Sequence, residues 1–105
     1  GGARDTALLS PASVGALNEL RTAADLMLHG LAVFRAVSPS CPCDLAVLTQ
    51  DGRLLRIEVT TGYRGLSGKL TFGAHDSAKY DCIAVVTHEG HIEYQPMLSE
   101  LLGQP

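Results

Sequence analysis

Two acidic side chains, those of Asp44 and Glu58, have the type and the spacing to share one site. They belong to two alternating apolar segments separated by residues 50–52, Gln-Asp-Gly, and Asp-Gly between such segments is a strong β-hairpin signal. A two-residue loop would point the two carboxylates to opposite faces of the hairpin. A three-residue loop with its glycine in the left-handed conformation pairs Thr49 with Arg53 and places Asp44 directly across from Glu58.

The three-residue loop is favoured because it separates polar from apolar side chains cleanly. A slip of one residue would bury one of the two carboxylates. In the favoured register the face opposite the carboxylates is fully apolar, and it carries Leu45, Val47, Leu55, Ile57 and Val59.

Directly opposed carboxylates would have Cβ atoms about 4.5–5.5 Å apart and would repel each other unless a positive charge lay between them. A divalent cation, Mg²⁺ or Mn²⁺, is the candidate, because Mg²⁺ takes oxygen ligands from one or two carboxylates together with substrate phosphates. The alternative from these two residues alone is a solvent-facing pair of strands whose charges are simply hydrated.

A first helix precedes this hairpin. Ser10 is expected to cap it with Pro11 in its first turn, Ser13 is the competing cap, and Gly30 is expected to end it. Glu19 lies beside the apolar stripe of this helix. An acidic side chain at that position is either partly exposed to solvent or directed at a binding partner. The stripe, which we expect to face the core, consists of Val14, Leu17, Leu20, Ala24, Met27, Leu28 and Leu31.

The remaining segments are short and predict a mixed sheet. The glycine-rich basic stretch 62–69 is expected to form a loop. Helix, three strands, a connecting segment and further strands indicate the α/β class, a central mixed sheet flanked by helices, within one domain over 1–105. The expected elements after the first helix are strands over 31–37, 44–49, 53–60, 69–72, 82–87 and 92–94, a helical turn over 74–80 and a closing helix over 96–102.

The charge distribution is uneven. The formal net charge is −3, yet residues 53–80 hold five bases against two acids, a local balance of +3 that leaves −6 on the remainder. Local basic surface is what attracts phosphate, so we expect nucleic acid to meet this region, although dispersed bases also occur as a solvated rim. The bases expected to contact nucleic acid are Arg56, Arg64, Lys69 and Lys79.

No apolar run approaches the roughly 20 residues of a membrane span, and no basic-then-apolar leader opens the chain. Three cysteines, an odd number, together with that opening favour free thiols and a cytoplasmic protein without a membrane partner. The segment 88–91, His-Glu-Gly-His, is interpreted as an exposed turn in preference to a pair of metal ligands.

Four features in this order resemble the PD-(D/E)XK nuclease superfamily: Glu19 on the first helix, Asp44 opening the second strand, Glu58-Val59-Thr60 on the third, and Tyr80-Asp81 before an apolar strand. The resemblance covers most of the chain. It is nearest the branch of group I intron homing endonucleases and Holliday-junction resolvases, and it implies a restriction-endonuclease-like core in αβββαβ order.

The resemblance implies a metal-dependent endonuclease that hydrolyses phosphodiester bonds in DNA. Asp44, Glu58 and the Val59 carbonyl would hold Mg²⁺ or Mn²⁺, and Glu19 would serve as an outer acid. The metal would neutralise the phosphate and orient the attacking water. A chain this small covers little DNA, so we expect a homodimer if both strands are cut, with an interface on the last strand and the C-terminal helix.

The sequence departs from the family pattern at Thr60, which stands where the motif lysine belongs. A hydroxyl donates a hydrogen bond but supplies no charge. Three interpretations remain open: the lysine function has moved to Lys69, with Lys79 as second choice; the protein binds nucleic acid without cutting; or residue 60 is itself altered.

Each residue also has an ordinary explanation. Asp44 could cap a strand, Glu58 could pair with a neighbouring arginine, and Thr60 is a natural β-former. Three functions are therefore weighed: a metal-dependent DNA endonuclease, a catalytically inactive nucleic-acid-binding domain on the same fold, and a structural interaction domain.

Overall fold

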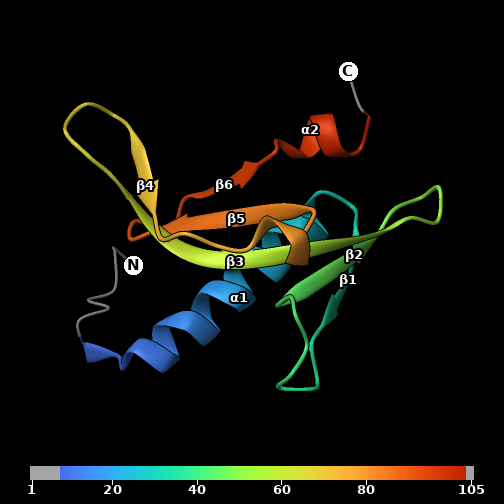
Figure 1. Cartoon of the computed structure of the whole chain (residues 1–105), viewed down its shortest axis with the longest axis horizontal. Helices are drawn as coiled ribbons and strands as arrows, with labels where there is room; N and C mark the ends of the chain where they lie inside the picture. Colours follow the sequence, from blue (N-terminus) through green and yellow to red (C-terminus); the bar gives the residue numbers. More distant parts are fainter. Residues whose placement is uncertain (1–7, 104–105) are drawn as a thin grey trace.

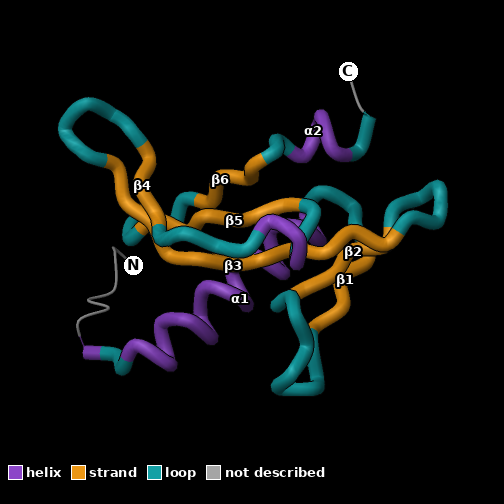
Figure 2. Tube along the Cα trace, viewed as in Figure 1, coloured by secondary structure: helices purple, strands orange, loops and turns teal. Residues whose placement is uncertain are grey.

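The computed structural model describes residues 8–103 and shows a six-stranded mixed β-sheet with helices packed on it (Figures 1 and 2). The strand order is β1-β2-β3-β5-β6, and β4 pairs with β3 outside this path. The α/β class and the predicted order of elements are confirmed. The elements are α1 (Pro11–Leu28), β1 (Ala32–Arg35), β2 (Leu45–Leu48), β3 (Leu54–Arg64), β4 (Leu70–Phe72), the 3-10 turn η2 (Ser77–Lys79), β5 (Cys82–Thr87), β6 (Ile92–Gln95) and α2 (Leu98–Leu101).

The hairpin of β2 and β3 has the predicted three-residue loop. The Thr49 amide donates to the Arg53 carbonyl at 2.8 Å, and Gly52 has a φ of +85°. Leu45 pairs with Ile57 and Leu48 with Leu54, so the next position beyond the ladder sets Asp44 across from Glu58. Local turn chemistry therefore fixed this register, as the sequence indicated.

The strands β3 and β5 are parallel neighbours, so a crossover must join them. That crossover contains β4 and η2, and residues 73–81 pass over the sheet face opposite α1, visible as the loop running along β3 and β5 in Figure 2. All six residues of β5 are buried, because this apolar strand lies inside the sheet between β3 and β6.

The main core lies between the other sheet face and the two helices. Leu26 of α1 and Leu98 of α2 belong to one buried cluster with apolar side chains of three strands. The strand members of this cluster are Leu45, Val47, Leu55, Ile57, Cys82 and Ala84. The face predicted to be apolar in the hairpin is thus the one that the helices cover.

The caps of α1 are as predicted, but its buried face is not. Ser10 accepts a hydrogen bond from the Ser13 amide at 3.2 Å, Pro11 is the first helical residue, and Gly30 follows the helix with a φ of +81°. The stripe expected in the core lies largely outside, because Leu20, Ala24, Met27 and Leu28 are exposed.

The face of α1 that meets the sheet is partly polar. It buries Asn18, Thr22 and Leu26. The Thr22 hydroxyl donates to the Asn18 carbonyl at 2.8 Å, and the Asn18 side chain donates to the Thr61 hydroxyl at 3.0 Å. Satisfied hydrogen bonds remove the usual cost of burying these groups, so the polar ridge can face the sheet while the apolar stripe does not.

The strand β3 is longer than predicted. Gly62, Tyr63 and Arg64 continue it into pairing with β4, so only residues 65–69 form the expected loop. A Cβ at Gly62 would overlap the Val85 side chain and lie 2.9 Å from the Thr71 carbonyl oxygen. Glycine is required there because β5 and β4 both pass close to that backbone.

Candidate functional site

Asp44 and Glu58 lie at the open end of the β2–β3 hairpin, where the ladder stops. Beyond the Leu45–Ile57 pair, the Val59 amide donates to the Asp44 carboxylate at 2.9 Å instead of to a strand carbonyl. The Ala36 amide donates to the Asp44 carbonyl at 3.2 Å, which ties this position to the end of β1. The predicted opposition of the two acids is thus present in the fold.

Glu58 carries the perturbed carboxyl group of this pair. The pKa of Glu58 is raised to about 7, first by burial, then by the hydrogen bond that it shares with Asp44 and by the Asp44 charge. The Val59 amide and the charge of Lys79 act in the opposite direction. The raised pKa of Glu58 beside a second acid marks a place where a cation would relieve the repulsion between the two carboxyl groups.

Glu19 approaches the same place from α1. Burial and the charge of Asp44 raise its pKa, and Arg35, whose guanidinium lies 3.9 Å from the Glu19 carboxylate, lowers it. The structure therefore sets Asp44 across from Glu58 and brings Glu19 near enough for the charge of Asp44 to act on it. They come from α1, the start of β2 and the middle of β3.

His75 is a member of this group that sequence reasoning missed. Its Nε2 lies 3.0 Å from the Thr60 hydroxyl, and its Nδ1 lies 3.5 Å from the Glu58 carboxylate. Both His75 and Glu58 are largely buried, with side-chain exposures of 23% and 19%. No local sequence pattern predicts that His75 lies beside Glu58, because its position depends on how the β3–β5 crossover lies across the sheet.

The structure places the two candidate lysines at different distances along the chain from Glu58. Lys69 closes the β3–β4 hairpin opposite Gly65, seven residues beyond Glu58, which amounts to about 23 Å of extended strand. The suggestion that Lys69 takes over the function of the motif lysine stays a prediction. Lys79, the second choice, is close enough to Glu58 for its charge to lower the pKa of that carboxyl.

The two arginines predicted to contact nucleic acid both have acidic partners. Arg56 donates twice to Asp81, at 3.2 Å from each of Nε and Nη2, and once to the Ala78 carbonyl at 2.9 Å. Arg64 contacts Glu93 and the Gly68 carbonyl. Asp81 thus holds the start of β5 against β3 through Arg56.

Oxygen ligands are available for a metal ion, and their chemistry fits Mg²⁺. Asp44 and Glu58 supply carboxylates held side by side, and the partly protonated Glu58 reports an unfavourable negative charge density. Within residues 8–103, no group of three or more acidic, histidine or cysteine side chains is arranged around a single point as a complete ligand set. The fit is therefore that of a two-carboxylate site completed by backbone, water or phosphate oxygens.

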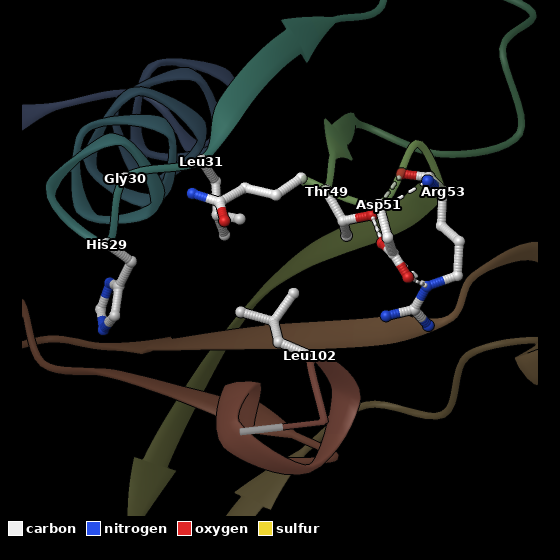
Figure 3. A pocket seen from close by; sticks show the side chains of 8 residues that line it. His29, Gly30, Leu31, Thr49, Asp51, Arg53 and Leu102 are labelled. Atoms are coloured by element: carbon white, nitrogen blue, oxygen red, sulfur yellow. Dashed lines mark hydrogen bonds and ion pairs between the residues drawn. The ribbon is translucent and has the colours of Figure 1, made fainter. Parts of the chain in front are cut away.

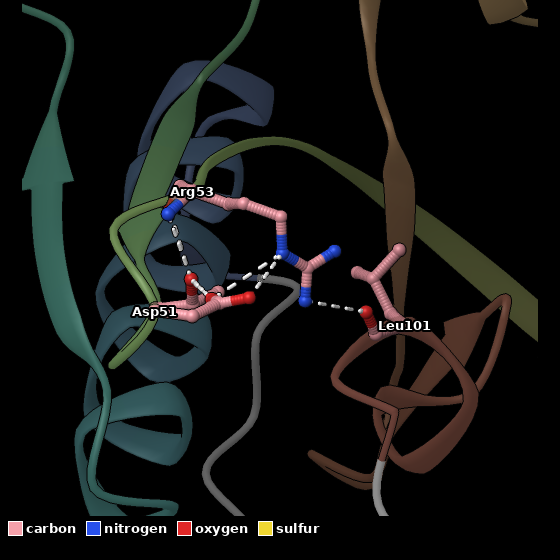
Figure 4. A network of polar contacts seen from close by, with 4 residues as sticks. Asp51, Arg53 and Leu101 are labelled. Carbon is pink, nitrogen blue, oxygen red and sulfur yellow. Dashed lines mark hydrogen bonds and ion pairs between the residues drawn. The ribbon is translucent and has the colours of Figure 1, made fainter.

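The larger hollows of the molecule lie elsewhere. A pocket of about 290 Å³ sits at the turn end of the hairpin, between the end of α1 and the end of α2 (Figure 3). Arg53 borders it, pairing with Asp51 and donating to the Leu101 carbonyl at 3.4 Å (Figure 4). These contacts attach the hairpin turn to α2, and the pocket does not include the paired acids.

Only a small hollow adjoins the acids. A pocket of about 100 Å³ includes Asp44 together with Arg35, Cys43 and neighbouring residues of β1 and β2. An open, shallow site of this kind suits a group presented on the surface of a large substrate better than a small molecule enclosed in a cavity.

None of the helices among the described residues is long and apolar enough to cross a membrane.

No family model matches the chain, and no curated protein matches it significantly in sequence. Among solved structures, the fold is similar to that of the bacterial homing endonuclease I-Ssp6803I, with a TM-score of 0.66 and 12% sequence identity. The match covers 91% of this chain and 74% of that one. The chain therefore has the mixed α/β fold of this endonuclease.

Proposed function

We propose that this chain is a nuclease domain of the PD-(D/E)XK type, a metal-dependent endonuclease acting on phosphodiester bonds in DNA. The observation that carries the proposal is the juxtaposition of Asp44 and Glu58 at the open end of the hairpin, with the pKa of Glu58 raised to about 7. The similar fold belongs to a homing endonuclease, which supports the same class of reaction.

In this proposal Asp44 and Glu58 hold Mg²⁺ or Mn²⁺, with the Val59 carbonyl as a further ligand. The bound ion would supply neutralisation of the phosphate and an activated water. Asp44 is held in place by the Val59 amide, and Glu58 by His75. Glu19 stands behind Asp44 as an outer acid that keeps negative charge, and hence cation affinity, at this point.

Without the motif lysine, the chain has one positive charge fewer to stabilise the activated water. Thr60 can donate one hydrogen bond, and its hydroxyl lies beside His75. Lys79 would supply the positive charge that the motif lysine supplies in the family, because its charge already lowers the pKa of Glu58. We expect Lys79→Ala to reduce cleavage and Lys69→Ala, a change in the hairpin loop, to leave the chemical step unchanged.

The proposal is tested by nicking of supercoiled plasmid in Mg²⁺ or Mn²⁺. Asp44→Asn and Glu58→Gln should each abolish nicking, whereas Glu89→Gln, in the exposed β5–β6 turn, should leave it intact. Titration of Mn²⁺ into the same proteins gives an independent result, because the two site variants should lose binding. Nicking that survives Asp44→Asn would contradict the proposal.

A second candidate, DNA binding without cleavage, is favoured by one observation. Thr60 replaces the charged residue expected to assist the water, and no lysine takes its position on β3. Retained DNA affinity with no nicking in either metal would select this candidate. Absence of salt-dependent DNA affinity would exclude both and leave a structural role.

A further inference from the structure

The β3–β4 hairpin, residues 62–72, extends beyond the rest of the sheet (Figure 1). Its two strands pair as far as Arg64 and Leu70, and every residue of its tip, 65–69, is exposed. In Figure 1 the tip lies on the opposite side of β3 from α1, and the crossover that passes over Glu58 also lies opposite α1. A substrate spread over the paired acids can therefore also contact this hairpin.

The tip of the hairpin is ordered by its own hydrogen bonds. The Gly65 amide donates to the Lys69 carbonyl at 3.0 Å, and the Gly68 amide donates to the Gly65 carbonyl at 2.9 Å. The Arg64 guanidinium donates to the Gly68 carbonyl and pairs with Glu93 of β6, so one side chain ties the tip to the body of the sheet. A hairpin that is already formed loses little conformational freedom when it binds a partner.

The charge of this region favours an anionic partner. Residues 59–75 contain no acidic side chain and carry Arg64 and Lys69, which leaves a net charge of −5 on the remainder of the chain. Lys69 is exposed and has no acidic side chain within ion-pair distance among the described residues. A local concentration of positive charge on an acidic protein attracts a polyanion to that place.

The apolar residue at the tip narrows the choice of partner. Leu66 is 111% exposed, so it contributes nothing to the packing of the fold. One leucine is too small for a protein interface, because the apolar patches that mark such interfaces measure several hundred Å². The major groove of DNA, in contrast, admits a two-stranded β-ribbon and offers base edges to single apolar side chains.

We propose that the β3–β4 hairpin enters the major groove of duplex DNA, with Leu66 against the base edges and Lys69 on a phosphate. This inference rests on the proposed function, in which DNA is the substrate. Arg64 is then a positioning residue, because its guanidinium is used to hold the tip against β6.

The length of β3 sets where on the DNA this contact falls. Leu66 follows Glu58 by eight residues, which amounts to at most about 26 Å of extended strand. At about 3.4 Å for each base pair, this span corresponds to at most about eight base pairs. The hairpin therefore contacts bases at a distance from the cleaved phosphate, and a strand lying obliquely to the duplex shortens that distance to about four base pairs or more.

Two leucines provide a matched test of binding. Leu66→Asp and Leu28→Asp both alter a highly exposed side chain, at 111% and 87%, and change the net charge equally. Affinity is measured by anisotropy with a labelled duplex of about 30 base pairs at low salt, in EDTA so that neither metal nor cleavage takes part. Leu66→Asp should weaken binding by about 10-fold or more, and Leu28→Asp by less than about 3-fold. Circular dichroism checks folding.

Mapping of nicks locates the contact. Plasmid nicks made by the unaltered protein in Mn²⁺ are sequenced, and a base preference should appear about four to eight base pairs to one side of the nick. Leu66→Ser should still nick but lose this preference, and Leu28→Ser should keep both.

The outcomes separate this inference from the nuclease proposal. Equal affinities of the two aspartate variants, or no base preference in that interval, would overturn the hairpin contact while nicking upholds the nuclease. No nicking by any of these proteins, with Leu66→Asp alone weakened in binding, would overturn the nuclease and support the hairpin contact. No measurable affinity for the duplex would overturn both.

Discussion

At the scale of single residues, the site is defined by where negative charge accumulates. Burial and the neighbouring Asp44 raise the pKa of Glu58, and Glu19 adds a third acid from α1. His75 and Lys79 reach the group from the crossover and not from the strands that carry the acids. The balance of charge at the site is therefore set by two segments that are separate in sequence.

The raised pKa of Glu58 predicts a pH-dependent stability. A carboxyl whose pKa is higher in the folded state than its usual 4.5 stabilises the fold below pH 4.5, and that contribution is lost as pH rises through about 7. Urea unfolding should therefore show a loss of about 1–3 kcal/mol from this group between pH 5 and 8. Glu58→Gln should remove that dependence.

The matched control for this measurement is Glu89→Gln, because Glu89 is exposed in the β5–β6 turn. It should leave the pH profile of unfolding unchanged. A profile of Glu58→Gln identical to that of the unaltered protein would show that Glu58 ionises normally in the fold. Saturating Mn²⁺ should flatten the profile of the unaltered protein, since a bound cation displaces the proton.

His75 is predicted to be a positioning residue for Glu58 and Thr60. His75→Ala should cost about 1 kcal/mol of unfolding free energy through the lost contacts, and about 10–100-fold in Mn²⁺ affinity through a less fixed Glu58. Calorimetric titration of Mn²⁺ measures the second quantity without DNA. His88→Ala, at an exposed turn, should change neither.

At the scale of elements, β3 organises the fold. It pairs with β2, β4 and β5, and it carries Glu58 and Thr60 on one face with Ile57 and Val59 on the other. The crossover must then pass over the face that carries the acids, which brings His75 to Glu58. The close approach of β4 and β5 at Gly62 is the condition for this arrangement.

Gly62 is therefore predicted to be intolerant of even one added carbon. Gly62→Ala should lower the unfolding free energy by about 1–3 kcal/mol, the usual cost of overpacking, because the Thr71 carbonyl is backbone and cannot rotate away. Gly65→Ala, three residues on, meets no atom within 4 Å and should change stability little. Urea unfolding of both variants compares them directly, and equal stabilities would contradict the packing argument.

At the scale of the whole molecule, the proposed binding of DNA would have to overcome a net charge of −3. Four bases within residues 53–80 are predicted to contact DNA. Two of them already have acidic partners, because Arg56 pairs with Asp81 and Arg64 with Glu93. The other two, Lys69 and Lys79, have no acidic side chain within ion-pair distance among the described residues. The basic surface is therefore smaller than the residue counts alone indicate. A bound divalent cation would add to it at the paired acids.

The affinity for duplex DNA is accordingly predicted to depend only moderately on salt. Two to four phosphate contacts per copy correspond to a slope of about −2 to −4 in log affinity against log salt concentration. Fluorescence anisotropy with a labelled duplex measures this slope. Lys79→Ala should reduce its size by about 1, and a slope near −8 would mean that both arginines release their acidic partners to bind phosphate.

The sequence by itself determined the features that depend on neighbours along the chain. The Ser10 cap, the loop at residues 50–52, and hence the opposition of Asp44 and Glu58, follow from turn chemistry and alternation. The order of elements followed from the same local patterns. These agree with the structure because backbone geometry and side-chain period act over a few residues.

Tertiary structure alone decided which face of α1 meets the sheet, which lysine acts on Glu58, and that His75 belongs to the site. Periodicity assigns the most apolar face to the core, but Asn18 and Thr22 can be buried once Thr61 and the helix backbone satisfy them. That pairing, like the reach of His75 across β3, joins segments far apart in sequence. No local pattern contains the information, because the contacts exist only after the crossover and the sheet have formed.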